Sequence, residues 1–370
     1  MNKLIVGNLV HRPLRSIISA FAVAIEVIMI LSIAAIMFGM LNNSRTGTAG
    51  IGGDMVVHPG ASTALMNTSA ASADVRIADV LRGLPHVKVV APINIKLTAG
   101  ASLENIYGID FESFNALRPF VFKAGGPFEH PFDMIIDDLQ AASGKGLKVG
   151  DTVKALNHQF RVCGIVEHGK GSRKFIQLAT MDQLDGITGP LKASAFYIRT
   201  EEPPKYQEAV RKEILSSEGL SDWSVQTLDE LLSSLTPEKM PGFNIALNVV
   251  ITIATIIGFL VIFQSMYTAV MERTREIGIL KSMGASPADI VSVVLRETGL
   301  LAVVGVVLGV AGTFALRSFL HVRFPTLSFA VTPRWVLTGV LIALCGAICG
   351  AAYPALKAAR KDPIEALSYE

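Results

Sequence analysis

The sequence predicts an α-helical membrane protein with four transmembrane helices and a large, two-lobed α+β extracytoplasmic domain between helices 1 and 2. Two observations support this fold class. Of the 370 residues, 51% are hydrophobic and only 17% are charged, and the apolar residues gather into four long runs. Each run reaches the length of about 20 residues that a helix needs to cross a hydrocarbon core about 30 Å thick. Between the first two runs, residues 42–240 have an ordinary globular composition and suffice for a core of their own.

The distribution of basic residues predicts the orientation of the four helices. An even number of spans places both termini on one side, and Lys and Arg are enriched on the cytoplasmic side of a membrane. The short loop between the last two runs contains only Arg317, Arg323 and Arg334. A larger basic set lies beside the opposite helix ends, so both termini are expected in the cytoplasm of a multi-pass protein of the cell (inner) membrane. This set comprises Lys3, Arg12, Arg15, Arg273, Arg275, Lys281, Arg296, Lys357, Arg360 and Lys361.

These spans give an expected layout for the whole chain. It consists of a cytoplasmic amphipathic N-terminal segment (1–15), transmembrane helix 1 (16–41), the extracytoplasmic domain (42–240), transmembrane helix 2 (243–270), a cytoplasmic helix and loop (271–290), transmembrane helix 3 (291–320), a short extracytoplasmic loop (321–334), transmembrane helix 4 (335–356) and a cytoplasmic tail (357–370).

The extracytoplasmic domain contains an approximate internal repeat. Residues 77–93 and 206–228 each predict a helix followed by a strand. Two such units at the two ends of the domain predict one lobe made from about 42–110 and 195–235. Between the units, β-like runs at 160–166, 174–179 and 196–199 are separated by glycine turns. A second, β-rich lobe is therefore expected at about 111–194, inserted into the first.

No catalytic or metal site is expected from the sequence. The seven histidines are scattered, and neither a His-Glu-x-x-His pair nor a Gly-x-Ser-x-Gly turn is present. The segment around Lys170 spaces its glycines like a phosphate-binding loop, but Gly171 stands where such a loop needs Ser or Thr. Cys345 and Cys349 supply too few ligands for a metal and are expected to be small packing residues. The net charge of +2 suggests no nucleic-acid partner.

The loop between the second and third helices carries the clearest local signals. Ser286 and Asp289 flank Pro287 in the pattern of a capping box with proline at the first helical position, which predicts where the third long helix begins. Gly284 is expected to end the preceding helix. The loop carries charged residues and glycines, and we expect it to be accessible to a soluble protein.

Residues 271–283 predict a short amphipathic helix ahead of that glycine. Its Ile277, Ile279 and Leu280 are expected to enter an apolar groove of a partner protein, while Glu276 and Lys281 pair at the rim of the groove. The alternative is a charged helix end that lies on the lipid surface.

Two features stand out within the membrane spans. Gly305-x-x-x-Gly309 and Gly346-x-x-x-Gly350 predict faces of close helix approach, although the ordinary abundance of glycine in membrane helices explains them equally well. Glu26 lies near the middle of the first span, where an acidic residue costs about 2.5–3.5 kcal/mol unless it faces protein or water. It is expected to point into a helix interface, either as a structural hydrogen bond or as a polar contact that changes between conformations.

Three segments carry a recognisable pattern: Asn8 to Ser16, the loop Arg275 to Ile290, and the tail Tyr353 to Leu367. The pattern Arg-x-x-Glu-Ile-Gly-x-x-x-x-x-Gly-Ala-Ser begins at Arg273 and runs into the loop, and the tail contains Pro-Ala and Pro-Ile-Glu-Ala-Leu. Together they resemble the FtsX-like permeases of ABC transporters, specifically the four-helix group of the MacB, LolC and LolE type. The resemblance extends over the whole chain.

The resemblance implies a permease subunit that is not itself an enzyme and binds no cofactor. Because the chain starts at the membrane, the ATPase that binds ATP and Mg is expected as a separate subunit. A second permease copy or a paralogue, membrane lipid and a periplasmic adaptor are further partners that it suggests. ATP hydrolysis would move the extracytoplasmic domains (mechanotransmission) to export or extract a lipoprotein, a lipid, a peptide or a small toxic compound. The residues expected to couple to the ATPase are Arg275, Glu276, Ile277, Gly278, Lys281, Gly284 and Ser286.

Two alternatives remain open at this point. One is an FtsX-like regulator that activates a cell-wall hydrolase without transport, and the other is a membrane sensor that works without an ATPase. The size of the two-lobed domain favours the exporter group, because the division protein of the family has a smaller one. The charged loop argues against the sensor.

Overall fold

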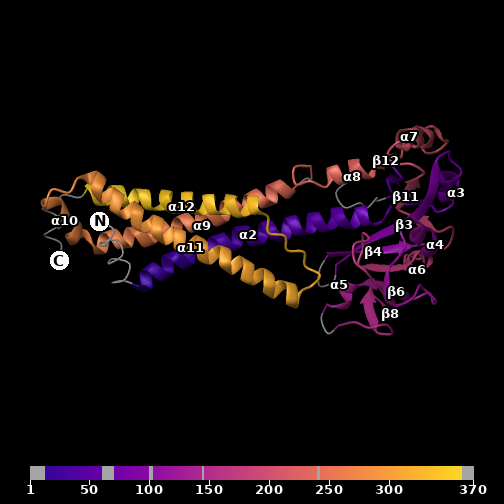
Figure 1. Cartoon of the computed structure of the whole chain (residues 1–370), viewed down its shortest axis with the longest axis horizontal. Coiled ribbons are helices and arrows are strands. Elements are labelled where there is room, and N and C mark those ends of the chain that lie inside the picture. Colours follow the sequence, from indigo (N-terminus) through magenta and orange to yellow (C-terminus); the bar gives the residue numbers. More distant parts are fainter. Residues whose placement is uncertain (1–12, 61–70, 100–102, 144–145, 240–241, 361–370) are drawn as a thin grey trace. The chain divides into compact units, whose positions relative to one another are not determined.

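The computed structural model describes residues 13–60, 71–99, 103–143, 146–239 and 242–360. These residues form two compact units (Figure 1). The helical unit contains the chain up to residue 39, residues 244–320 and the chain from residue 329, whereas the α/β unit contains residues 40–243 and 321–328. The predicted N-terminal segment up to residue 12 and the predicted tail beyond residue 360 lie outside the described residues.

In the part of the helical unit that the structure describes, there are four long helices and one short one. All four long helices are long and apolar enough to cross a membrane. Each extends beyond the predicted span, and the largest difference is at the end of the first, which continues past residue 41 and contributes residues 40–50 to the α/β unit. The helices are α2 (Pro13–Gly50), α9 (Phe243–Glu272), α10 (Thr274–Ser282), α11 (Pro287–Arg323) and α12 (Pro333–Arg360).

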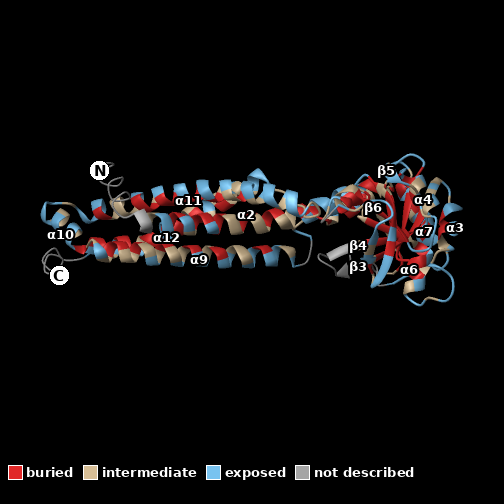
Figure 2. Ribbon diagram, turned by 90° about the horizontal axis from the view of Figure 1, so that it is seen from below, coloured by how far each residue is buried: buried red, intermediate tan, exposed pale blue. Residues whose placement is uncertain are grey.

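The core of the helical unit is made of small and branched side chains. Val27 of α2, Ile262 of α9 and Ala347 of α12 are among its buried residues. The same helices also carry large apolar side chains on their outer faces, such as Phe21 and Ile245, which are 61% and 68% exposed. Figure 2 shows buried and exposed residues alternating along each of these helices. Helices that are apolar on both faces are typical of a membrane span.

The α/β unit contains one mixed ten-stranded sheet with the order β12-β1-β11-β3-β4-β9-β6-β8-β5, in which β7 pairs with β8, and a two-stranded sheet of β2 and β10. Most neighbours are antiparallel, but β4 pairs with β9, and β6 with β8, in parallel. The elements are β1 (Met55–His58), β2 (Ala73–Asp74), α3 (Ile77–Arg82), β3 (Val87–Ala99), β4 (Leu103–Ile109), α4 (Phe111–Leu117), β5 (Phe122–Gly125), β6 (Asp133–Asp137), α5 (Asp138–Ala141), β7 (Thr152–Ala155), β8 (His158–Val166), β9 (Lys174–Gln177), α6 (Leu178–Leu184), β10 (Lys192–Ala193), β11 (Ala195–Thr200), α7 (Gln207–Ser216), β12 (Ser224–Thr227) and α8 (Leu228–Ser234).

Both predicted helix-then-strand units are present, as α3 with β3 and α7 with β12. Leu81 of α3 and Ile214 of α7 are fully buried in the same hydrophobic cluster, so the two ends of the domain pack together as expected. The predicted run 174–179 is a strand only as far as Gln177, because Leu178 begins α6. The two lobes also share their sheet: β4 lies beside β9, with Tyr107 opposite Phe175.

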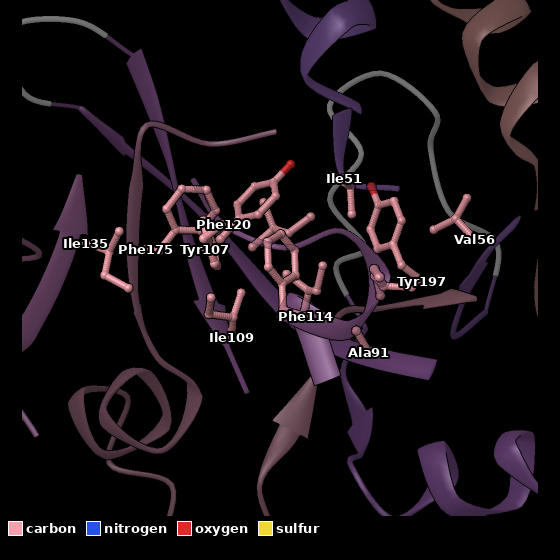
Figure 3. Close-up of a cluster of buried hydrophobic side chains, with 14 of the residues drawn as sticks. Ile51, Val56, Ala91, Tyr107, Ile109, Phe114, Phe120, Ile135, Phe175 and Tyr197 are labelled. Carbon is pink, nitrogen blue, oxygen red and sulfur yellow. The ribbon is translucent and has the colours of Figure 1, made fainter. Parts of the chain in front are cut away.

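A second cluster in this unit is aromatic. Figure 3 shows the rings of Tyr107, Phe114, Phe120 and Phe175 side by side, and the ring centroids of Phe120 and Phe175 lie 5.3 Å apart. The ammonium of Lys170 lies 4.1 Å from the centroid of Phe120 and donates to the carbonyl of Arg118. Burial lowers the pKa of Lys170 to about 8. This lysine is therefore part of the core, which agrees with the rejection of a phosphate-binding loop.

Candidate functional site

The short helix α10 ends at a glycine, as the sequence predicts. Gly284 has a φ of +98°, a left-handed conformation that glycine adopts without a steric penalty. Its N–H donates to the carbonyl of Lys281 at 3.0 Å, and the N–H of Ala285 donates to the carbonyl of Leu280 at 3.0 Å. These two bonds form a Schellman motif, which satisfies the last carbonyls of α10.

The predicted capping box at the start of α11 is also present. Ser286 Oγ accepts a hydrogen bond from the N–H of Asp289 at 3.2 Å, and Asp289 Oδ2 accepts one from the N–H of Ser286 at 3.0 Å. Pro287 occupies the first helical position, where its missing N–H costs nothing. The loop of Gly284 to Ser286 therefore has a defined conformation at both of its ends.

The inner face of α10 packs against the chain's own helices. Ile277 and Leu280 lie against a buried cluster that includes Val270 of α9, Ile290 of α11 and Ala358 of α12. Gly278 of the same face is buried. The expectation that Ile277 and Leu280 enter a groove of another protein is thus wrong for these two side chains, because the amphipathic face of α10 already has a partner within this chain.

Two polar contacts fix α10 further. Nη1 of Arg273, at the junction of α9 and α10, lies 3.1 and 3.3 Å from the two carboxylate oxygens of Glu297 on α11. Both side chains are mostly buried, at 13% and 11% exposure. Lys281 Nζ donates to the carbonyl of Ala359 at 2.9 Å, near the end of α12. The sequence analysis expected Lys281 to pair with Glu276 and did not predict this bond to the carbonyl of Ala359.

Glu297 is a residue that the sequence reasoning did not single out. It interrupts an apolar run and stands beside Arg296. The available signal was that an acidic group within a predicted membrane span needs a basic partner. Several basic residues lie near the same helix ends, and the sequence does not say which of them pairs with Glu297.

The outer face of α10 is formed by Arg275, Glu276, Ile279 and Met283, all of them exposed. Their spacing places them within about 100° around the helix axis. The large apolar side chains Ile279 and Met283 are 43% and 71% exposed. Adjacent charges of opposite sign beside two exposed apolar side chains are typical of a protein-binding surface.

Glu26 points into the interface between α2, α9 and α12, as expected. It is 3% exposed, and a Cβ atom added to Gly258 of α9 would overlap its carboxylate, while one added to Gly346 of α12 would lie 3.8 Å from Oε1. Neither carboxylate oxygen has a hydrogen-bond partner among the described residues. The described residues therefore do not supply the expected structural hydrogen bond. A polar link between α2 and α9 is made by the hydroxyls of Ser19 and Ser265, whose oxygens lie 2.5 Å apart.

The four predicted packing glycines do not behave alike. A Cβ atom at Gly305 or Gly309 of α11 would lie 2.6 or 2.7 Å from a Cβ atom of α2, and one at Gly350 of α12 would lie 2.9 Å from the carbonyl oxygen of Phe259 on α9. These three glycines allow close helix approach. At Gly346 the nearest atom would be 3.8 Å away, which is ordinary contact.

Among the described residues, no group of three or more His, Cys, Asp or Glu side chains could hold a metal ion. Cys345 and Cys349 are exposed on α12, so the expectation that they pack within the bundle is wrong for this chain. Cys163 is buried in the α/β unit, and burial raises the pKa of its thiol to about 12.

Two family models match the chain, one on each part. The model of the MacB-like periplasmic core domain matches residues 16–216, and the model of the FtsX-like permease C-terminal region matches residues 248–363. The first of these covers more than half of the chain.

Curated relatives share between 27% and 28% sequence identity with this chain. An uncharacterized ABC transporter permease of Methanocaldococcus jannaschii is 27% identical over 60% of this chain and 58% of that protein. The macrolide export ATP-binding/permease protein MacB is 28% identical in Escherichia coli, over 72% of this chain and 42% of that protein. Its relative MacB 1 of Yersinia pestis is 28% identical over 60% and 35%. The chain thus spans less than two thirds of the length of each of these relatives.

Proposed function

The chain belongs to the FtsX-like ABC transporter permeases with a MacB-like periplasmic core domain, and from this premise we propose that it couples ATP hydrolysis by a separate ATPase subunit to movement of its α/β unit. In this proposal the chain hydrolyses nothing itself, and ATP and Mg bind to the partner. Two copies of the chain, or the chain and a paralogue, assemble with two ATPase subunits. The work is export or extraction of a substrate.

The outer face of α10 is the observation that carries the proposal. A partner that presents an apolar groove with charges of both signs at its rim would cover Ile279 and Met283 and pair with Arg275 and Glu276. Because α10 is capped at its end and held by Arg273, Lys281 and the buried cluster, such a partner would meet a rigid surface. A rigid surface loses little conformational entropy on binding.

The same contacts offer a path for transmitting movement. The inner face of α10 is packed on α9, α11 and α12, so a displacement of α10 acts on three long helices at once. Gly305 and Gly309 bring α11 close to α2, and α2 continues without a break from the helical unit to Gly50 in the α/β unit. A movement at α10 is thereby delivered to the α/β unit as a movement of α2.

A charge reversal on the outer face tests the ATPase assignment. Glu276→Lys and Met283→Glu change exposed side chains and leave every inner contact intact, so the variant should fold. We expect at least a tenfold loss of affinity, equivalent to about 1.4 kcal/mol, and a matching loss of permease-stimulated hydrolysis. Binding and hydrolysis are measured with the full-length chain in nanodiscs and the ATPase that copurifies with it from its own membranes.

Lys205→Glu is the matched control, because Lys205 is exposed in the α/β unit and distant in sequence from α10. This variant should bind and stimulate the ATPase like the wild type. A bulky residue at Gly278 is not a suitable test, since Gly278 is buried and its replacement would disturb the packing of α10 against the other helices. Undiminished stimulation in the Glu276→Lys, Met283→Glu double variant would remove the coupling role of the outer face.

The proposed orientation has both termini and α10 in the cytoplasm and the α/β unit outside the cell membrane. It is tested by single cysteines at the exposed residues Ser221 of the α/β unit and Ser282 of α10, in a chain from which the native cysteines have been removed. A membrane-impermeant thiol reagent should label Ser221→Cys in intact spheroplasts and Ser282→Cys only after permeabilisation. The reverse pattern would invert the orientation.

A further inference from the structure

A shallow groove of about 390 Å³ lies between α9 and α12, away from the outer face of α10. Phe263, Gln264 and Tyr267 of α9 form one wall, and Tyr353 and Lys357 of α12 form the other. Tyr353 is 56% exposed within the part of the chain that the structure describes. The described residues that line the groove supply an ammonium group, an amide, phenol hydroxyls and aromatic rings, and none of them carries a carboxylate.

Lys357 is the charged residue among those that line the groove. Its Nζ donates to the hydroxyl of Tyr267 at 2.9 Å and lies 4.7 Å from the centroid of that ring. The described polar groups beside this ammonium are the hydroxyls of Tyr267 and Tyr353. An ammonium has three donors, and one of them is used within the described residues, by the hydroxyl of Tyr267. A positive charge without a carboxylate beside it favours a negatively charged ligand.

The remainder of the groove is apolar. The ring of Phe263 stacks against Phe259 and Tyr267, with centroids 6.2 and 6.0 Å apart, and is tilted against the ring of Tyr353, whose centroid lies 5.8 Å away. On the same two helices, Leu260 and Leu356 are 53% and 49% exposed. The aromatic rings therefore continue from Lys357 along α9 as a track that an acyl chain can cover.

The position along the helices fits the depth of a lipid headgroup. Lys357 lies in the last turn of α12, which ends at Arg360, and Tyr267 lies shortly before the end of α9 at Glu272. Tyrosine is enriched where a membrane helix meets the headgroups, and lysine side chains reach the same level. A basic pocket between membrane helices at this depth suits an anionic headgroup.

From these contacts we infer that the groove binds an anionic phospholipid, with its phosphate on Lys357 and an acyl chain along Phe263. A zwitterionic lipid lacks the net negative charge, and a free anion makes no use of the apolar track. The inference requires only that α9 and α12 lie in a bilayer. It does not depend on the proposed ATPase partner, so either proposal can fail without the other.

Native mass spectrometry of the full-length chain in an uncharged detergent tests this site. The protein is titrated with phosphatidylglycerol and with phosphatidylcholine of the same acyl chains. The wild type should bind one phosphatidylglycerol at least fivefold more tightly than phosphatidylcholine. Lys357→Gln keeps a donor for Tyr267 but loses the charge, and should lose this preference. Arg360→Gln removes an exposed charge from the same helix outside the groove, and should keep it.

Several outcomes would overturn the inference. Equal binding of the two lipids by the wild type, or an equal loss in the two variants, would show that no specific site exists at Lys357. Displacement of phosphatidylglycerol by inorganic phosphate alone would indicate a site for a free anion. If the wild type binds no lipid and Phe263→Ala abolishes a dimer, a second copy of the chain covers the groove. Unchanged thermal unfolding of each variant shows that a loss of lipid is not a loss of fold.

Discussion

Removing either member of the Arg273–Glu297 pair should loosen α10 from α11. The perturbation is a set of three variants: Arg273→Met, Glu297→Leu and the double replacement. Each single variant leaves one charge without a partner in a place that is almost closed to solvent, since the side chains are 13% and 11% exposed. The double variant leaves no charge behind and replaces both groups by apolar side chains.

The geometry sets the size of the effect. One nitrogen of Arg273 contacts both carboxylate oxygens, at 3.1 and 3.3 Å, so the pair is well formed but not bidentate through two nitrogens. Breaking a buried pair by removing one partner costs about 3–5 kcal/mol. The slight exposure places the expected cost of each single variant near the lower end, at about 3 kcal/mol. The double variant should cost less than either single one.

The assay is a double-mutant cycle on the purified full-length chain in detergent. Thermal unfolding reports the stability of the helical unit, and stimulation of the partner ATPase reports the position of α10. Arg296→Met is the control, because Arg296 is exposed next to Glu297 and its removal should change stability by less than about 0.5 kcal/mol. If the single variants cost no more than this control, or if their effects simply add, Arg273 and Glu297 do not hold α10.

Three further predictions concern other residues. Gly309→Ala should destabilise the helical unit by about 1–3 kcal/mol because the new Cβ atom would lie 2.7 Å from a side chain of α2, whereas Gly346→Ala should be tolerated; equal unfolding temperatures would contradict this contrast. Glu26→Leu removes two unpartnered buried oxygens and should stabilise the isolated chain, while Glu26→Gln should leave assembly intact; a destabilised Leu variant would reveal a partner for the carboxyl in the assembled protein. Burial raises the pKa of Asp137 to about 6. The folded protein therefore binds the proton of Asp137 more tightly than the unfolded protein does. The stability that results is complete below about pH 4 and is lost as the pH rises through 6. Asp137→Asn should therefore be more stable than the wild type by about 2–3 kcal/mol at pH 7 and equal to it at pH 4. The free energy of unfolding is measured by urea unfolding with the fluorescence of Trp223, in a chain that lacks the other tryptophan. The same difference at both pH values would refute the raised pKa of Asp137.

Local signals in the sequence were sufficient for part of the candidate site. Gly284 and the Ser286 capping box act within one turn of their own backbone, so their residue types predict their geometry. The inward direction of Ile277 could not be predicted in the same way, because an apolar helix face shows that something covers it but not whether that is the same chain or another one. The Arg273–Glu297 pair joins different helices, and a single sequence contains no signal for that choice among several basic residues.

The same limit applies to the α/β unit. The helix-then-strand units were predictable because the apolar period changes within a short window at 77–93 and at 206–228. The pairing of β4 with β9 was not, since parallel neighbours need a long crossover and their register depends on packing across the sheet. Local patterns indicated some of the strands, such as the run at 160–166, but missed others, such as β1 and β4, and the order of the strands is decided by contacts between distant segments.

The shared sheet limits how this protein can be recombined with its relatives. A chimera that replaces only residues 111–194 would replace β9 but keep β4. The relative's strand would then have to pair with β4, and a different residue would lie opposite Tyr107 in place of Phe175. Unmatched strand edges invite aggregation. Exchange should instead take residues 51–242 as one cassette, with its breakpoints at the end of α2 and before α9, where no strand pairing is cut. Natural recombination within the family would face the same restriction, so the two lobes are expected to be inherited together.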